Sequence, residues 1–192
     1  MTWPAGMVSA RRTTLNLAAT SFAALAGALF LALAMTRRLN FDESLALRAG
    51  WLDLTGESSA PAFLMPWTLF SGAVGRLIPD PGVVFIALRL LAAAGVAWAF
   101  AAALRAAGVV GGAFAAAAWL AVANVAFATH ALEFRYDAAV LILLLVAYRL
   151  LVLGGSPTAL GVIAGVLALH HLKGAYYALG VAAVFLSMSS AR

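Results

Sequence analysis

The stretch from Thr14 to Thr36 is apolar and holds no charged residue. About 20 such residues let an α-helix cross the hydrocarbon core of a bilayer. The whole chain shares this character, since 65% of its residues are hydrophobic and 10% are charged, against about 25% charged in soluble domains. We therefore expect an all-α, polytopic membrane protein. A cleaved signal peptide is the alternative for this first stretch, because Ala32-Leu33-Ala34 is similar to a cleavage site.

Further apolar runs predict a single membrane domain that is a transmembrane bundle of about six helices. Their expected ranges are 14–36, 82–104, 109–128, 138–153, 158–172 and 174–188. The last two are divided at Gly174, because one continuous helix would bury His170, His171 and Lys173 in lipid at a high cost. Two interfacial helices, 42–54 and 61–78, are expected in the first outer loop.

The few charged residues orient these helices. Arg11 and Arg12 precede the first span, and the positive-inside rule places such residues in the cytoplasm, together with the N-terminus. If 61–78 lies flat in the interface, Arg105 and Arg149 are also cytoplasmic and all seven acidic residues lie outside. If 61–78 crosses, this separation of charge is lost, so we prefer the flat arrangement. The Ala- and Arg-rich composition suggests a bacterial inner membrane.

Asp42 and Glu43 are adjacent carboxylates at the point where the chain leaves the first span. Asp42 can cap the helix that follows, since its side chain can accept hydrogen bonds from the amides of the first turn. A cap with a solvated neighbour is one interpretation of the pair. The other is functional, because a lipid headgroup would arrive at this position.

Arg89 lies about two turns inside the second span, where an unpaired arginine costs at least about 2.5 kcal/mol. We therefore expect it to face the bundle and to meet an anion, which is either an acidic residue of the outer loop or a bound phosphate. Glu133, Arg135 and Asp137 form a second polar cluster, in which Asp137 can cap the fourth span. That cluster is either structural or part of a cavity shared with Asp42.

Two features near the end of the chain complete the set of candidates. Lys173, at the expected helix break, is a candidate ligand for a phosphate group. Gly161 and Gly165 form a GxxxG pattern, which favours close packing of membrane helices.

Several classes of function are excluded or disfavoured. The chain has no cysteine, which excludes disulfides, thiolate catalysis and Cys-ligated metals. Its arginines are scattered at the ends of segments, so nucleic acid is not an expected partner. It has no P-loop, no HExxH and no soluble region that could bind a nucleotide-sugar. Any donor would therefore be a lipid.

The order of these features resembles the GT-C superfamily of polytopic glycosyltransferases. The nearest branch is related to the dolichyl-phosphate-mannose protein mannosyltransferases and the lipid A aminoarabinose transferases. The segments that carry the resemblance are FDES (41–44), PAFLMPW (61–67), IALRLLAAAG (86–95), EFRYDAAVLILLL (133–145) and GVIAGVLALHHLKGA (161–175). They are short, and they are spread over most of the chain.

The resemblance implies an inverting transfer of a sugar from a polyprenyl-phosphate donor to an acceptor hydroxyl at the outer face. It implies that Asp42 is the general base, with Glu43 as its neighbour. Arg135 and Lys173 match basic residues that hold the donor phosphate, and Asp137 matches an acid at the start of the fourth span. Together with Arg89, these residues are the predicted site.

The chain also departs from the family pattern. The HxKPP segment of the family is here ESSAPAF (57–63), without its histidine and lysine, and family members are usually much longer. We therefore expect either a transferase that a partner chain completes, or a non-catalytic integral-membrane accessory subunit of a larger complex. A transporter is disfavoured because the polar residues gather at one face. No metal site is predicted, although a divalent ion among Asp42, Glu43 and Asp137 is left open.

Overall fold

The structure is a computed structural model that describes residues 5–36, 41–56, 66–133, 135–170 and 172–190. The secondary structure of this part of the chain is entirely helical, which confirms the expected all-α class. Its nine helices are α1 (Ala5–Thr36), α2 (Phe41–Thr55), α3 (Pro66–Leu77), α4 (Pro81–Ala106), α5 (Gly111–Ala123), α6 (Val125–Leu132), α7 (Tyr136–Val152), α8 (Pro157–His170) and α9 (Leu172–Ser190).

Two of the helices in the described part of the chain are long and apolar enough to cross a membrane, judged by length and composition. They are residues 16–36 of α1 and the whole of α4, which coincide with the first two expected spans. α5, α8 and residues 174–187 of α9 are apolar but shorter. α1 also extends the first expected span toward the N-terminus, since its helix begins at Ala5.

The expected third membrane helix, 109–128, is divided into two helices, so the prediction of one continuous helix was wrong. α5 ends at Ala123 and α6 begins at Val125, with an extended Asn124 between them. The Asn124 side chain accepts a hydrogen bond from the backbone N–H of Phe127 at 2.9 Å. Because this bond satisfies an amide of the first turn, Asn124 starts a new helix instead of continuing the old one.

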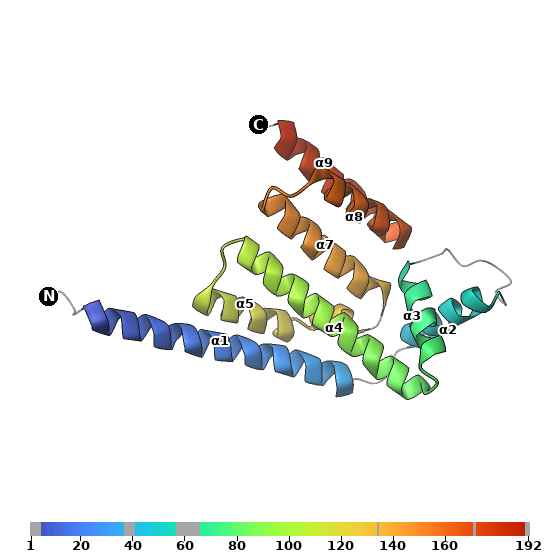
Figure 1. The fold of residues 1–192 in the computed structure, drawn as a ribbon, viewed down its shortest axis with the longest axis horizontal. Coiled ribbons are helices and arrows are strands. Elements are labelled where there is room, and N and C mark those ends of the chain that lie inside the picture. The colour runs from blue at the N-terminus through green and yellow to red at the C-terminus, as the bar shows by residue number, and fades with distance from the viewer. Residues whose placement is uncertain (1–4, 37–40, 57–65, 134, 171, 191–192) are drawn as a thin grey trace.

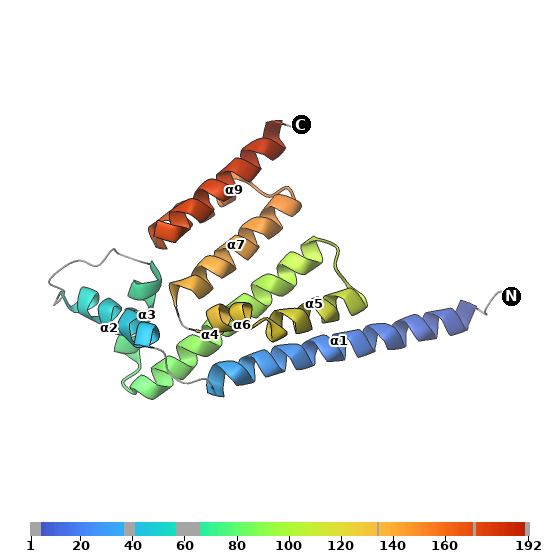
Figure 2. The same ribbon diagram turned by 180° about the vertical axis from the view of Figure 1, so that it is seen from behind.

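The long helices lie side by side, with α1 at one edge and α9 at the other (Figure 1). α4 packs against α1 and α7, α7 packs against α8, and α5 packs along α1. The helices α2 and α3 pack against each other beside the point where α4 begins, and we call this side of the molecule the α2–α3 end. α7 also begins there, as both views show (Figures 1 and 2), and α8 ends there (Figure 1).

α2 and α3 are held together by contact between their two backbones. A Cβ added at Gly50 would lie 1.9 Å from the carbonyl oxygen of Thr68, and one added at Gly72 would lie 2.2 Å from the carbonyl carbon of Gly50. Only glycine allows so close an approach. The helix predicted at 42–54 is confirmed as α2. Of the segment 61–78, residues 66–77 are helical, and 61–65 lie outside the described residues.

Close packing of α8 against α9 depends on Gly174, where a Cβ would lie 2.0 Å from the carbonyl oxygen of Leu167. The GxxxG pair predicted a different contact. A Cβ at Gly161 or Gly165 would meet nothing within 4 Å. The described chain therefore uses neither glycine of that pair for close packing, and the prediction that it does was wrong.

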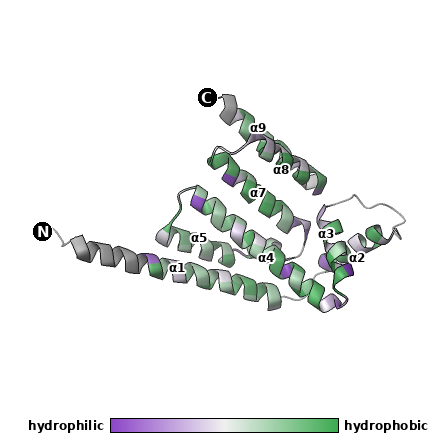
Figure 3. Ribbon diagram, in the orientation of Figure 1, coloured by the Kyte–Doolittle hydropathy of each residue, from purple (hydrophilic) through white to green (hydrophobic). Residues whose placement is uncertain are grey.

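Two apolar clusters hold the helices together. The larger lies between α1, α4, α6 and α7 and is centred on Phe30, Leu88 and Val96, whereas the smaller joins α7, α8 and α9 through Leu160 and Leu167. Most residues along the helices are hydrophobic (green in Figure 3). Exposed large side chains include Leu25, Trp98, Leu120, Leu179 and Leu186. Such a surface suits a hydrocarbon environment.

Candidate functional site

Glu43 and Arg89 form a buried ion pair at the α2–α3 end. Glu43 lies in the first turn of α2, and Arg89 projects from α4. The Arg89 Nε donates to Glu43 Oε1 at 2.8 Å, and Nη2 donates to Oε2. Glu43 is 0% exposed and Arg89 is 5% exposed. Of the two anions expected for Arg89, the structure contains the acidic side chain of the protein itself.

The fork-shaped geometry explains how this pair tolerates burial. A guanidinium and a carboxylate that share two parallel hydrogen bonds recover more of the lost hydration than a single contact would. Glu43 is therefore held by Arg89 and buried, so it is a positioning residue for α2 in this structure. Glu43 follows Asp42 directly in the sequence, and the role of Asp42 as general base stays a prediction.

Glu133, Arg135 and Asp137 form a second ionic group in the turn between α6 and α7. The Arg135 Nη1 donates to Glu133 Oε2 at 3.0 Å, and its Nε lies 3.6 Å from Asp137 Oδ2. Glu133 is 1% exposed, whereas the side chains of Arg135 and Asp137 are 19% and 21% exposed. The two partly exposed groups are therefore the ones that a ligand could reach.

Asp137 does not cap α7, so that prediction was wrong. The N-cap position is Arg135, whose backbone is extended and whose side chain makes no capping bond. Asp137 lies instead in the first turn of α7, where a negative charge interacts favourably with the helix dipole. This location leaves its carboxylate beside Arg135 and at the surface of the bundle.

The two ionic groups are close together. Glu133 interacts electrostatically with the guanidinium of Arg89, so one ionic cluster connects α2, α4 and the turn before α7. We use this name for Glu43, Arg89, Glu133, Arg135 and Asp137. With three carboxylates and two guanidinium groups, its formal charge is −1. The structure thus brings together the acid after the first span and the acids near the fourth.

Asp42 and Lys173 are placed by their backbones only, because their side chains lie outside the part of the molecule that the structure describes. Asp42 is the second residue of α2, one position inside the helix start at Phe41, so it belongs to the first turn and not to the expected cap. Lys173 is the second residue of α9. Its helix begins near α3 in both views (Figures 1 and 2).

A cavity of about 370 Å³ lies beside the ionic cluster, between α6, α7 and α9. Its lining includes Phe127, Asp137, Leu141, Leu144 and Tyr177. Asp137 is the one charged group among the described residues that line it. We call it the Asp137 groove. A carboxylate therefore lies at one end of an otherwise mostly apolar groove.

Tyr177 was not among the residues predicted for the site. It lies on α9 four positions after Lys173, and residues four apart share one face of a helix. This spacing is the signal that could have indicated it. Among the described side chains there is no group of three or more His, Asp or Glu residues that could hold a metal ion. The divalent ion left open above requires Asp42, whose side chain is not described.

Comparison with protein-family models, with curated proteins and with solved structures finds no match to this chain.

Proposed function

We propose that the chain crosses a bacterial inner membrane six times, through α1, α4, the pair α5 and α6, α7, α8 and α9. Two of these helices have the length and hydropathy of membrane spans. The distribution of charge supports the remainder. The acids with described side chains, Glu43, Asp80, Glu133 and Asp137, lie at the α2–α3 end or at the start of α4 or α7, whereas Arg105 and Arg149 lie in the last turns of those helices.

This separation also supports an orientation. By the positive-inside rule, Arg105 and Arg149 face the cytoplasm, together with the N-terminus. The α2–α3 end then faces outward, and α2 and α3 lie in the outer interface as short helices. The ionic cluster is placed by this arrangement at the outer boundary of the bilayer, where a membrane-bound substrate and a water-borne substrate can meet.

We infer that the protein acts there as a GT-C-like glycosyltransferase that takes a sugar from a polyprenyl-phosphate donor. The observation that carries this proposal is the Asp137 groove, because it joins an apolar surface for a prenyl chain to the ionic cluster. Arg135 is the partly exposed cation of that cluster. A phosphate held beside it would have its prenyl chain along α7 and Tyr177.

The net charge of the ionic cluster affects which residues can bind the donor phosphate. A net charge of −1 repels an anionic donor, so Arg135 alone is a weak site for it. Lys173 begins the neighbouring helix, and its ammonium group would supply a second cation for the phosphate and balance the added charge of Asp42. We therefore assign the donor phosphate to Arg135 and Lys173 together, and Arg89 to the positioning of α2 through Glu43.

In this proposal Asp42 removes the proton of the acceptor hydroxyl as the hydroxyl oxygen attacks the anomeric carbon. A placed carboxylate contributes roughly 10²- to 10⁴-fold in rate. The bond from the anomeric carbon to the phosphate oxygen breaks in the same step, and the leaving phosphate gains negative charge. Fixed cations at Arg135 and Lys173 stabilise that charge in the transition state.

The test is sugar transfer from a defined polyprenyl-phosphate sugar by purified protein in lipid vesicles. Asp42→Asn is expected to lower the transfer rate by roughly 10²- to 10⁴-fold, the contribution of a general base, while membrane insertion stays normal. The matched control is Asp53→Asn, the same change near the other end of α2, which is expected to leave the rate unchanged. Equal rates for both variants and the unmodified protein would contradict the proposal.

One observation favours the second candidate, a non-catalytic accessory subunit of a larger membrane complex. Glu43 and Arg89, two of the six residues predicted for the site, are buried against each other. That arrangement joins α2 to α4 and occupies both groups with each other. Under this alternative, no transfer is detected with any donor, and the unmodified protein is extracted in mild detergent as part of a stable larger assembly.

A further inference from the structure

Two adjacent cavities lie between α1, α4 and α5, away from the α2–α3 end. The first, of about 350 Å³, is lined by Thr20, Arg105 and the residues from Val109 to Gly111. The second, of about 190 Å³, lies further along the same helices and extends to Phe127 of α6. Ala23 and Phe114 line both cavities, so the two are neighbours and share a boundary.

The second cavity has the chemistry of a hydrocarbon site. Its described lining consists of Ala, Gly, Val and Phe residues, among them Phe30, Phe100 and Phe127. Its volume exceeds the roughly 150 Å³ of an apolar cavity that stays dry and takes up benzene. With no polar side chain in that lining, water has no hydrogen-bonding partner there. The material that fits it in a bilayer is a lipid chain.

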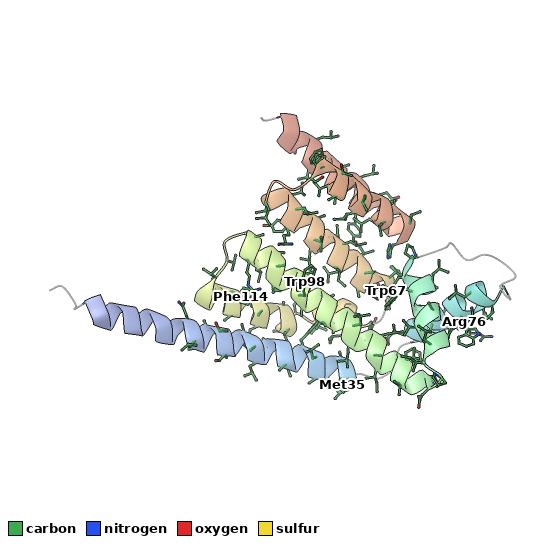
Figure 4. All side chains as sticks on the ribbon, in the orientation of Figure 1. Met35, Trp67, Arg76, Trp98 and Phe114 are labelled. Carbon is green, nitrogen blue, oxygen red and sulfur yellow. The ribbon has the colours of Figure 1, made fainter. Side chains whose placement is uncertain are left out.

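The first cavity differs because it contains a cation. Arg105, in the last turn of α4, is exposed, and its guanidinium carbon lies 5.4 Å from the centre of the Phe114 ring. A cation over an aromatic face is held in place without losing its charge. Phe114 lies beside the end of α4 (Figure 4), so Arg105 lies in the first cavity over a ring that lines both.

We propose that these cavities bind one anionic phospholipid, with its headgroup phosphate at Arg105 and one acyl chain in the apolar cavity. A guanidinium complements the phosphate, and the phenylalanines complement the chain. The headgroup contact at Arg105 is at the end of the bundle opposite the ionic cluster, whereas the apolar cavity extends to Phe127, which also lines the Asp137 groove. This phospholipid site rests on the membrane arrangement proposed above and does not depend on transferase activity.

The headgroup contact is tested by native mass spectrometry of the purified protein with an equal mixture of palmitoyl-oleoyl phosphatidylglycerol and phosphatidylcholine. The unmodified protein is expected to retain phosphatidylglycerol preferentially. Arg105→Gln is expected to lower this preference about fivefold, the effect of one basic residue near a lipid phosphate. Arg149→Gln changes the corresponding residue of α7, which does not line either cavity, and should retain the preference.

The acyl-chain contact is tested by filling the apolar cavity. Gly27 lines it, and a Cβ there would meet nothing within 4 Å, so Gly27→Leu can place its side chain in the space without a backbone clash. This variant should lose the bound phospholipid, whereas Ala28→Leu, at the adjacent exposed position, should keep it. Phosphatidylglycerol retention by both Arg105→Gln and Gly27→Leu at the level of the unmodified protein would overturn the proposal.

If the sugar-transfer test contradicts the proposed glycosyltransferase, the phospholipid-binding result is unaffected. Asp42→Asn lies at the other end of the molecule and is expected to retain the phospholipid fully. Loss of lipid binding in the cavity variants with normal sugar transfer would separate the two sites. Loss of phospholipid in Asp42→Asn would instead show that binding depends on the whole fold, and would contradict a local site at Arg105.

Discussion

Arg89 is a buried cation whose partner comes from a distant part of the chain. It lies eight residues into α4, which is about 12 Å along a helix, and the Glu43 that neutralises it is 46 residues away in sequence. Each of these charges alone would be costly to remove from water. The pair is therefore stable only when both partners are present, and this dependence can be measured.

Removal of either partner should destabilise the protein strongly. Glu43→Gln or Arg89→Met is expected to lower the free energy of unfolding by about 3–5 kcal/mol, because one charge is left buried without compensation. The double variant should cost less than the sum of the two single changes. Denaturation in detergent, followed by circular dichroism, measures all three. Arg48→Gln, an exposed arginine on α2, is the control and should change stability by less than about 0.5 kcal/mol.

For Arg89, the sequence predicted that the partner is an anion but not which anion it is. An arginine inside an apolar run requires an anion, and that requirement follows from the residue and its depth. Whether the anion is a ligand or a side chain depends on how α2 folds back onto α4, which involves contacts between distant segments. The N-cap residue of α7 was predicted wrongly for a similar reason. The tight turn from Glu133 to Arg135 does not change the hydropathy of the sequence, so hydropathy could not locate it.

Among the elements, the break at Asn124 shows where hydropathy is insufficient. Ala and Val residues lie on both sides of it, so the apolar run continues while the helix does not. The signal for this helix break was the single residue Asn124, because asparagine is among the strongest N-cap residues and is a weak helix former. Gly161 and Gly165 of α8 led to the opposite error. They match the GxxxG packing motif, but no neighbouring helix packs against them.

Gly174 should be far more sensitive to substitution than Gly180, the other glycine of α9. A Cβ at Gly174 would lie 2.0 Å from a backbone carbonyl of α8, so Gly174→Ala must separate the two helices. We expect a loss of at least about 1–3 kcal/mol, the usual cost of overpacking. Gly180→Ala, on the same helix with nothing within 4 Å of its added Cβ, should be neutral or stabilising by up to about 1 kcal/mol. Thermal unfolding in detergent compares the two, and equal midpoints would contradict the backbone contact.

For the molecule as a whole, the distribution of charge predicts which ends of the helices share a side of the membrane. The chain has no cysteine, so each introduced cysteine is unique. Thr36→Cys and Pro79→Cys lie at the α2–α3 end, whereas Ala107→Cys and Ser156→Cys follow α4 and precede α8. A membrane-impermeant maleimide added to intact cells should label the first pair, and should label the second pair only after the membrane is opened.

Labelling of positions 79 and 107 from the same side would contradict the arrangement, because α4 separates them. It would also place the ionic cluster and Arg105 on one face, and the proposed orientation would fail. The sequence predicted the helical class and the first two spans because both depend on long apolar runs. It could not predict the division of the shorter helices, which depends on single polar residues and on packing.

Glu43 and Arg89 are 46 residues apart in the sequence, and this distance along the chain has a consequence for protein synthesis. A chain leaves the ribosome from its N-terminus, so α2 emerges well before the arginine that neutralises it. Until residue 89 has been translated, burial of the Glu43 carboxylate is too costly, and α2 stays at the aqueous surface. Nascent chains stalled before Arg89 should therefore leave Glu43 accessible, and those stalled after α4 has inserted should not.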